Sequence, residues 1–228
     1  MSLISVSRDF LRAAKNGNPV DEFLIGFTAT SANHIIEELS DDNAKKVFWL
    51  NLYNAFVLIE FRTKRKLNYG GKVAFFQDVS LSLDEIEHGI IRGSKNKFGL
   101  GYLRKWRVSS FEKLARVQVM DYRIHFALNC GANSCPPIFM FSYKNLERDL
   151  DYLAEGYLMD SVCFKQQDIW LKVPRLCLWF FGDFGGFKGI KRMLKFYKIL
   201  APDEAPKIGF LNYDWSTNTN NFSIQIDV

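Results

Sequence analysis

The amino-acid sequence predicts an α+β fold, a mainly helical single domain with a small β-sheet. Several segments place apolar residues at helical spacing, as Phe48, Leu52 and Ala55 do. Alternating segments typical of strands are few and short, and no internal repeat or clear linker divides the 228 residues. A chain of this length, with 48% hydrophobic and 15% aromatic residues, can bury a substantial core.

The first part of the chain is predicted to form three short helices. Residues 3–15 form an amphipathic helix, Pro19 fits the first turn of a second helix, and Ser31 can cap a third. We interpret residues 1–42 as a helical lead-in that forms one compact unit with the domain at residues 43–228.

The clearest helix runs from Asn43 to about Lys66. Its apolar stripe predicts a position in the core, so its amides and hydroxyls are expected to anchor neighbouring loops. Asn54 is also a candidate for binding substrate. The basic end of this helix suits the helix dipole but is too short to indicate nucleic-acid binding.

A second motif precedes the centre of the chain. The segment Ser82-Leu-Asp-Glu85 matches a capping box, with Ser first and Glu three residues later. It opens a predicted helix from Leu83 to Arg92 that carries Glu87 and His88. From Gly89 to Ser110 there is no acidic residue, and the glycines here predict a solvated basic loop, with an anion-binding loop as the alternative.

The remaining predicted elements are short strands and two helices. They are a strand at Val73–Phe76, a helix at Tyr143–Met159, one or two strands within Cys163–Lys172, a helix at about Lys188–Leu200 and a terminal strand at Phe222–Asp227.

The segment from Asp121 to Pro137 carries the densest group of chemically active side chains. Apolar residues surround His125, Asn129 and Cys130, and a buried polar group without a partner costs about 1–3 kcal/mol. Alternating residues fit a strand, while Asp121 as a cap fits a helix start. His125 and Asn129, four residues apart, share a face in either structure, and Cys130 does not.

This segment predicts a thiol site. Cys130 is the candidate nucleophile, since a cysteine attacks as thiolate and needs a nearby imidazolium, cationic group or helix N-terminus to lower its pKa. His125 or His88 would be the base, and the chain must turn at residues 129–131 for His125 to reach Cys130. Asp121, Glu87 or Asn129 could orient the histidine that acts as base. Asn129 or the backbone N–H groups of the Gly131–Ser134 turn could stabilise an oxyanion.

Three other interpretations of the same residues stay open. His125, Cys130 and Cys135 could hold zinc, but their spacing matches no standard zinc pattern, so no metal or cofactor is expected. Cys130 and Cys135 could close a small disulfide loop. The polar network could also be entirely architectural, in a non-catalytic protein-interaction domain.

Charge and hydropathy limit the expected partners. The net charge of +5 is mildly basic, and we expect a small molecule or peptide rather than nucleic acid. No apolar stretch reaches the roughly 18 residues that span a bilayer, so no membrane partner is expected. The cysteines have no C-x-x-C spacing, which favours a reduced, cytoplasmic setting, with an exported parent and a trimmed leader as the alternative. The oligomeric state is not predicted.

Several motifs together resemble the family known as domain of unknown function 547. The matching segments are Val47-Phe-Trp-Leu-Asn-Leu-Tyr-Asn-Ala55, Ser82-Leu-Asp-Glu-Ile-Glu-His-Gly-Ile-Ile-Arg92, Asp121 to Pro136, Trp179-Phe-Phe-Gly-Asp-Phe184 and Asn212-Tyr-Asp-Trp-Ser-Thr-Asn218. The resemblance implies that the family's signature positions are Glu87, His88, His125, Asn129, Cys130, Cys135, Tyr213, Asp214 and Trp215. Tyr122 and Thr217 depart from the family's usual proline and leucine.

The resemblance supplies site residues but no reaction, because the family has no established activity. Some relatives look fused to thioredoxin-like or glutaredoxin-like domains, which keeps a thiol role plausible by analogy. The sequence therefore predicts a cysteine-dependent hydrolase or acyl transferase of unknown substrate. The candidate substrate-binding residues are Asn54, Tyr213, Asp214 and Trp215. The alternative is the non-catalytic interaction domain.

Overall fold

The structure, a computed structural model, describes residues 1–64, 67–164 and 170–216. Its elements in chain order are α1 Leu3–Asn16, α2 Asp21–Thr28, α3 Ala32–Glu38, α4 Asp42–Lys64, β1 Lys72–Phe75, β2 Ser80–Ser82, η1 Glu85–Ile91, α5 Ser110–Ala115, η2 Tyr122–Phe126, η3 Tyr143–Asn145, α6 Leu146–Ser161, β3 Cys163–Phe164, β4 Trp170–Val173, α7 Leu176–Trp179, α8 Gly186–Phe196 and β5 Lys207–Phe210. The predicted fold class, mainly helical with little sheet, is confirmed. None of the helices in the described part of the chain is long and apolar enough to cross a membrane.

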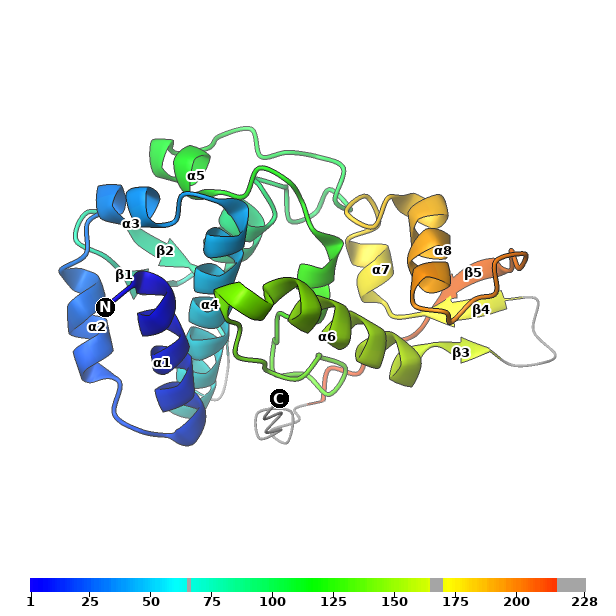
Figure 1. Ribbon diagram of the computed structural model, residues 1–228, viewed down its shortest axis with the longest axis horizontal. Coiled ribbons are helices and arrows are strands. Elements are labelled where there is room, and N and C mark those ends of the chain that lie inside the picture. The colour runs from blue at the N-terminus through cyan, green and yellow to red at the C-terminus, as the bar shows by residue number, and fades with distance from the viewer. Residues whose placement is uncertain (65–66, 165–169, 217–228) are drawn as a thin grey trace.

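The three N-terminal helices form where the sequence predicts them. Ser31 caps α3 by accepting a hydrogen bond from the backbone N–H of His34 at 3.2 Å. The aromatic ring of Phe10 in α1 contacts those of Phe27 in α2 and Phe56 in α4. Figure 1 shows α1 lying alongside α4, so the lead-in shares its core with the helix that follows. The domain boundary at residue 42 stays a prediction.

The strands form two small sheets in the described residues. β1 and β2 pair antiparallel, and so do β3 and β4, whereas β5 joins β4 in parallel register with Lys207 opposite Trp170. β2 and β5 were not predicted. The predicted terminal strand at Phe222–Asp227 lies outside the described residues, as do residues 165–169 within the predicted Cys163–Lys172 strands.

The capping box opens a π-helix rather than the ordinary helix that the sequence predicts. Glu85 accepts from the backbone N–H of Ser82 at 2.7 Å, and Ser82 Oγ accepts from the N–H of Glu85 at 3.2 Å. At the other end of η1, the N–H of Arg92 donates to the carbonyl of Glu87, five residues earlier. This wider winding is uncommon and recurs at functional sites.

The central segment is neither a strand nor an ordinary α-helix. Residues Tyr122–Phe126 form the 3-10 helix η2, which Asp121 caps by accepting from the N–H of Arg123 at 3.1 Å. The predicted cap is therefore confirmed and the strand interpretation is wrong. The chain after η2 is irregular through residue 142, so it depends on side chains from other elements for its shape.

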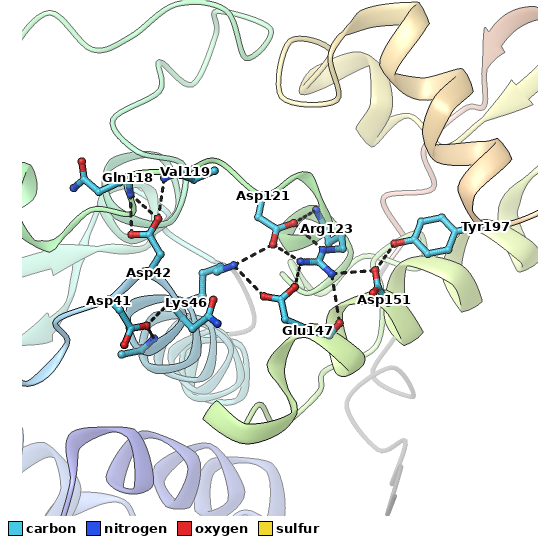
Figure 2. Close-up of polar contacts among 12 residues, drawn as sticks. Asp41, Asp42, Lys46, Gln118, Val119, Asp121, Arg123, Glu147, Asp151 and Tyr197 are labelled. Atoms are coloured by element: carbon cyan, nitrogen blue, oxygen red, sulfur yellow. Dashed lines mark hydrogen bonds and ion pairs between the residues drawn. The ribbon is translucent and has the colours of Figure 1, made fainter.

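A network of charged side chains joins α4, η2 and α6. Figure 2 shows Arg123 between Asp121, Glu147 and Asp151, with Tyr197, the residue that follows α8, donating to Asp151. Lys46 of α4 donates to Asp121 Oδ2 at 3.1 Å, and the same oxygen accepts from Arg123 Nη2. The predicted role of Asp121 in orienting a histidine is not supported, because both of its oxygens are engaged by these cations.

We expect Asp121→Asn to destabilise the protein at pH 7 by about 2 kcal/mol, and less at acid pH. Burial alone would raise the pKa of Asp121, but Arg123 and Lys46 hold it below the ordinary value. A depressed folded-state pKa gives stability that is present above the unfolded pKa of about 3.9 and is lost as the pH falls through the folded value. Denaturant unfolding at pH 7, 4 and 3 measures the difference between wild type and variant.

Asp9→Asn on the exposed face of α1 is the matched control, with an expected change within about 0.5 kcal/mol at each pH. If the Asp121→Asn difference stays constant down to pH 3, the ionised carboxylate does not stabilise this network.

Candidate functional site

A cavity of about 240 Å³ lies where η1, the loop after η2, α7 and the 212–216 segment meet. Its walls come from residues far apart in the sequence: Tyr53, Tyr69, Asp84, Glu87, His88, Lys97, His125, Leu128, Cys130, Cys135, Pro136, Leu176, Trp179, Phe180, Tyr213 and Trp215. Of the predicted catalytic residues, Glu87, His88, His125 and Cys130 line this cavity. Of the predicted substrate-binding residues, Tyr213 and Trp215 do so.

Cys130 and Cys135 are joined by a disulfide in this cavity. Their Cα atoms are 6.1 Å apart, which is within the range that a disulfide bridges. Cys130 is partly exposed and Cys135 is buried. The expectation of reduced cysteines therefore does not hold for this pair, and the disulfide loop weighed as an alternative is present. Cys177 is free and buried, and burial raises the pKa of its thiol.

Tyr213 lies against both sulfur atoms of the disulfide. Its hydroxyl oxygen is 3.3 Å from Cys130 Sγ and 3.1 Å from Cys135 Sγ. The ring of Tyr213 also contacts Trp179 and Trp215, with ring centroids 4.7 and 4.6 Å away. These three aromatic rings make one wall of the cavity beside the sulfur atoms.

Asp214 holds the chain that carries Tyr213 and does not line the cavity. Its carboxylate accepts from the side chain of Asn133 at 2.8 Å and from the N–H of Ser216 at 2.9 Å. Its backbone N–H donates to Ser134 Oγ and its carbonyl accepts from the N–H of Ser134. Asp214 therefore holds the 212–216 segment against the loop of residues 127–136, called the cysteine loop below. Its predicted contact with substrate stays a prediction.

Asn54 and Asn129 shape the cysteine loop from behind the cavity. Asn54 Nδ2 donates to the carbonyl of Ala127 at 2.9 Å, and Asn54 Oδ1 accepts from the N–H of Asn129 at 3.1 Å. Asn129 in turn bonds the carbonyl of Pro136 and the N–H of Gly131, at 2.6 and 2.7 Å. The expected anchoring role of the α4 amides is confirmed, whereas the oxyanion and substrate roles of these two residues are untested predictions.

His125 is buried in contact with an acid that the sequence did not indicate. Its Nε2 atom is 3.0 Å from Asp183 Oδ2, and its ring is stacked on Phe180 with centroids 3.8 Å apart. Burial lowers the pKa of His125 to about 4, although Asp183 opposes this shift. His125 is therefore neutral at pH 7, and its Nδ1 atom has no hydrogen-bond partner among the described residues.

His88 is paired with a fully buried arginine. Nη1 of Arg92 is 2.8 Å from His88 Nδ1, and the guanidinium carbon lies 4.5 Å from the centroid of the Phe180 ring. Arg92 also donates from Nε to Asp183 Oδ2 at 2.8 Å. Burial, together with the charge of Arg92, lowers the pKa of His88 to about 2, so this imidazole is also neutral.

Glu87 is a carboxyl group on the cavity wall whose acidity is altered by burial. Burial raises its pKa to about 7, against the opposing charge of Arg92. Its Oε2 atom accepts from the hydroxyl of Tyr53 at 3.3 Å. At neutral pH this group is partly protonated, so it can both donate and accept a hydrogen bond within the cavity.

Sequence reasoning alone missed Arg92 and Asp183 as site residues. Both stand inside the motifs Ser82–Arg92 and Trp179–Phe184 that carry the family resemblance, and that signal could have found them. Among residues 1–64, 67–164 and 170–216, no three His, Cys, Asp or Glu side chains gather in a way that could hold a metal ion.

A protein-family model described as "Protein of unknown function, DUF547" matches residues 36–158, which is more than half of the chain. The match includes α4, η1, η2 and the cysteine loop. No curated protein and no solved structure matches the sequence.

Proposed function

The chain belongs to the DUF547 family, which carries no known reaction, and we propose from the cavity alone that it is a cysteine-dependent hydrolase or acyl transferase. The observation that carries this proposal is the meeting of Cys130, two neutral imidazoles and a largely buried carboxyl group in one cavity. A thiol needs a neighbouring base to become a nucleophile, and neutral imidazole is the usual one.

In the proposed reaction the thiol of Cys130 gives its proton to an imidazole while its sulfur bonds to the acyl carbon of the substrate. The bond to the leaving group then breaks, and the leaving group departs with that proton. Water attacks the resulting thioester, releases the acid and restores the thiol. An alcohol or amine in place of water makes the same sequence an acyl transfer.

The disulfide sets a condition on this reaction, because a sulfur bonded to Cys135 is not a nucleophile. Two equivalents of a thiol can reduce the pair by thiol–disulfide exchange and are themselves oxidised to a disulfide. Cys130 is the more exposed of the two sulfur-bearing residues, so it is the one that a substrate in the cavity would meet. The proposal therefore assigns activity to the reduced protein.

We expect reduced Cys130 to react with iodoacetamide with an apparent pKa below the free value of about 8.5, because transfer of its proton to His125 pairs the thiolate with an imidazolium. The protein is reduced with a phosphine, and the alkylation rate of each cysteine is followed from pH 5 to 9 by mass spectrometry. His125→Ala should slow the reaction of Cys130 at pH 7 about tenfold or more, which corresponds to the loss of one pKa unit. Incubation with p-nitrophenyl acetate should acetylate the same cysteine.

Two comparisons make this measurement specific. His34→Ala removes an exposed histidine of α3 and should leave the alkylation of Cys130 unchanged. Cys177 should stay unreactive in the folded protein because it is buried. If reduced Cys130 reacts only after unfolding, or is never acetylated, the enzyme proposal is wrong.

One observation favours the non-catalytic alternative, in which this is a protein-interaction domain. The disulfide, Tyr213, Asn54 and Asn129 bond to one another or to backbone groups, as a purely structural network would. Under this alternative the reduced protein is destabilised but neither alkylated rapidly nor acetylated at Cys130. The experiment above therefore separates the two proposals.

A further inference from the structure

We infer that the buried Arg92–Asp183 ion pair gives the two cavity histidines opposite roles, with His125 as proton acceptor and His88 as hydrogen-bond donor to the substrate oxygen. This inference rests on the proposed function for its chemical meaning. Its structural content, the position of the proton on each imidazole, stands independently of that function.

His125 is held with its proton on Nε2. The carboxylate of Asp183 can only accept a hydrogen bond, so the Nε2 atom 3.0 Å from its Oδ2 must carry the proton. Asp183 is ionised at neutral pH, because contact with His125 and Arg92 outweighs the effect of burial and holds its pKa below the ordinary value. The lone pair of His125 is therefore on Nδ1, a buried atom that no described residue engages.

His88 also carries its proton on Nε2, but here the partner of the imidazole is a hydrogen-bond donor rather than an acceptor. A guanidinium only donates, so the Nδ1 atom 2.8 Å from Arg92 Nη1 must be the acceptor. The Nε2–H of His88 is 3.7 Å from Asp84 Oδ1, which is beyond hydrogen-bond range. Asp84 is itself engaged by Lys97, which donates to both carboxylate oxygens at 2.8 Å. The N–H of His88 is thus available to a ligand in the cavity.

The same ion pair therefore supplies an acceptor to one imidazole and a donor to the other. Asp183 can stabilise the imidazolium that forms when His125 takes the proton of Cys130. Arg92 keeps His88 neutral, so that His88 can donate to the oxygen that gains charge in the reaction without itself ionising. Arg92 and Asp183 are positioning residues in this scheme, since Arg92 does not line the cavity and neither does Asp183.

Long-range ¹H–¹⁵N spectra of the imidazole nitrogens test the inference on the oxidised protein, without any need for Cys130 to react. We expect His88 and His125 both to be neutral with the proton on Nε2, from pH 8 to pH 5. Their signals are assigned with His88→Gln and His125→Gln, and the exposed His34 gives the reference signal. A proton on Nδ1 of either cavity histidine, or an imidazolium at pH 7, overturns the inference.

Asp183→Asn adds a kinetic readout. The amide preserves the shape of the carboxylate but cannot stabilise an imidazolium, so alkylation of reduced Cys130 at pH 7 should fall about tenfold or more, with its pH profile displaced upward. An unchanged profile in a folded variant overturns the positioning role of Asp183. If the variant does not fold, the wild-type spectra still test the position of the proton on each cavity imidazole. If reduced wild-type Cys130 is unreactive, the proposed function is wrong. The inferred proton positions are then tested by the spectra alone.

Discussion

Replacement of Arg92 by methionine is expected to lower the free energy of unfolding by about 3–5 kcal/mol. Arg92 is completely buried, and its Nε and Nη2 atoms lie 2.8 and 2.7 Å from Asp183 Oδ2. Methionine fills similar space over Phe180 but leaves a buried carboxylate whose nearest other cation, Lys95 Nζ, is 3.9 Å from Oδ1. An unpaired buried charge costs far more than the loss of a surface pair. Denaturant unfolding at pH 7 measures the effect.

Arg12→Met provides the matched control, because Arg12 forms an exposed pair with Asp9 in α1. Its expected loss is below about 1 kcal/mol. The double variant Arg92→Met with Asp183→Asn should recover part of the stability, since the amide carries no charge. A loss no larger than that of Arg12→Met would mean that the buried pair does not support the fold.

Replacement of Asn54 by alanine is expected to cost about 1–3 kcal/mol for each of two backbone groups left unpaired. The groups are the carbonyl of Ala127 and the N–H of Asn129, which Asn54 binds simultaneously from α4. Both lie in the irregular chain just before Cys130, where no regular element can take over these hydrogen bonds. The free energy of unfolding should therefore fall by an amount comparable to the loss of a large core side chain.

Asn43→Ala, in the first turn of the same helix, is the comparison for the loss of one asparagine side chain. It should change the free energy of unfolding by no more than about 0.5 kcal/mol. Equal losses in the two variants would show that Asn54 does not hold the cysteine loop in place.

Local signals in the sequence predicted the helices well, and long-range pairing was missed. Ser31 and Ser82 cap their helices as expected, because a cap involves residues only three positions apart. Strands β2 and β5 are three or four residues long, and each exists only through its partner. The pairing of Lys207 with Trp170 depends on how α7 and α8 return the chain, which no short pattern records.

The same distinction applies to the site. His88, His125 and Cys130 stand out because these residue types are rare in the chain, and the fold brings them into one cavity. The acid beside His125 was sought in Asp121 or Glu87, and is Asp183 in the structure. Apart from the Trp179–Phe184 motif, nothing in the sequence around Asp183 distinguishes it from the other aspartates, since its role arises from the packing of η2 against the turn that follows α7.

The 212–216 segment is synthesised about 80 residues after the cysteine loop that it packs against. Tyr213 touches both sulfur atoms, while the N–H groups of Asn133 and Ser134 donate to the carbonyls of Ser216 and Asp214. Domains acquire structure from the N-terminal side as they leave the ribosome. The helices around α4 can pack while the cysteine loop is still open to solvent and to oxidants. Because Tyr213 and Trp215 line the cavity, its wall is complete only after the 212–216 segment has been synthesised.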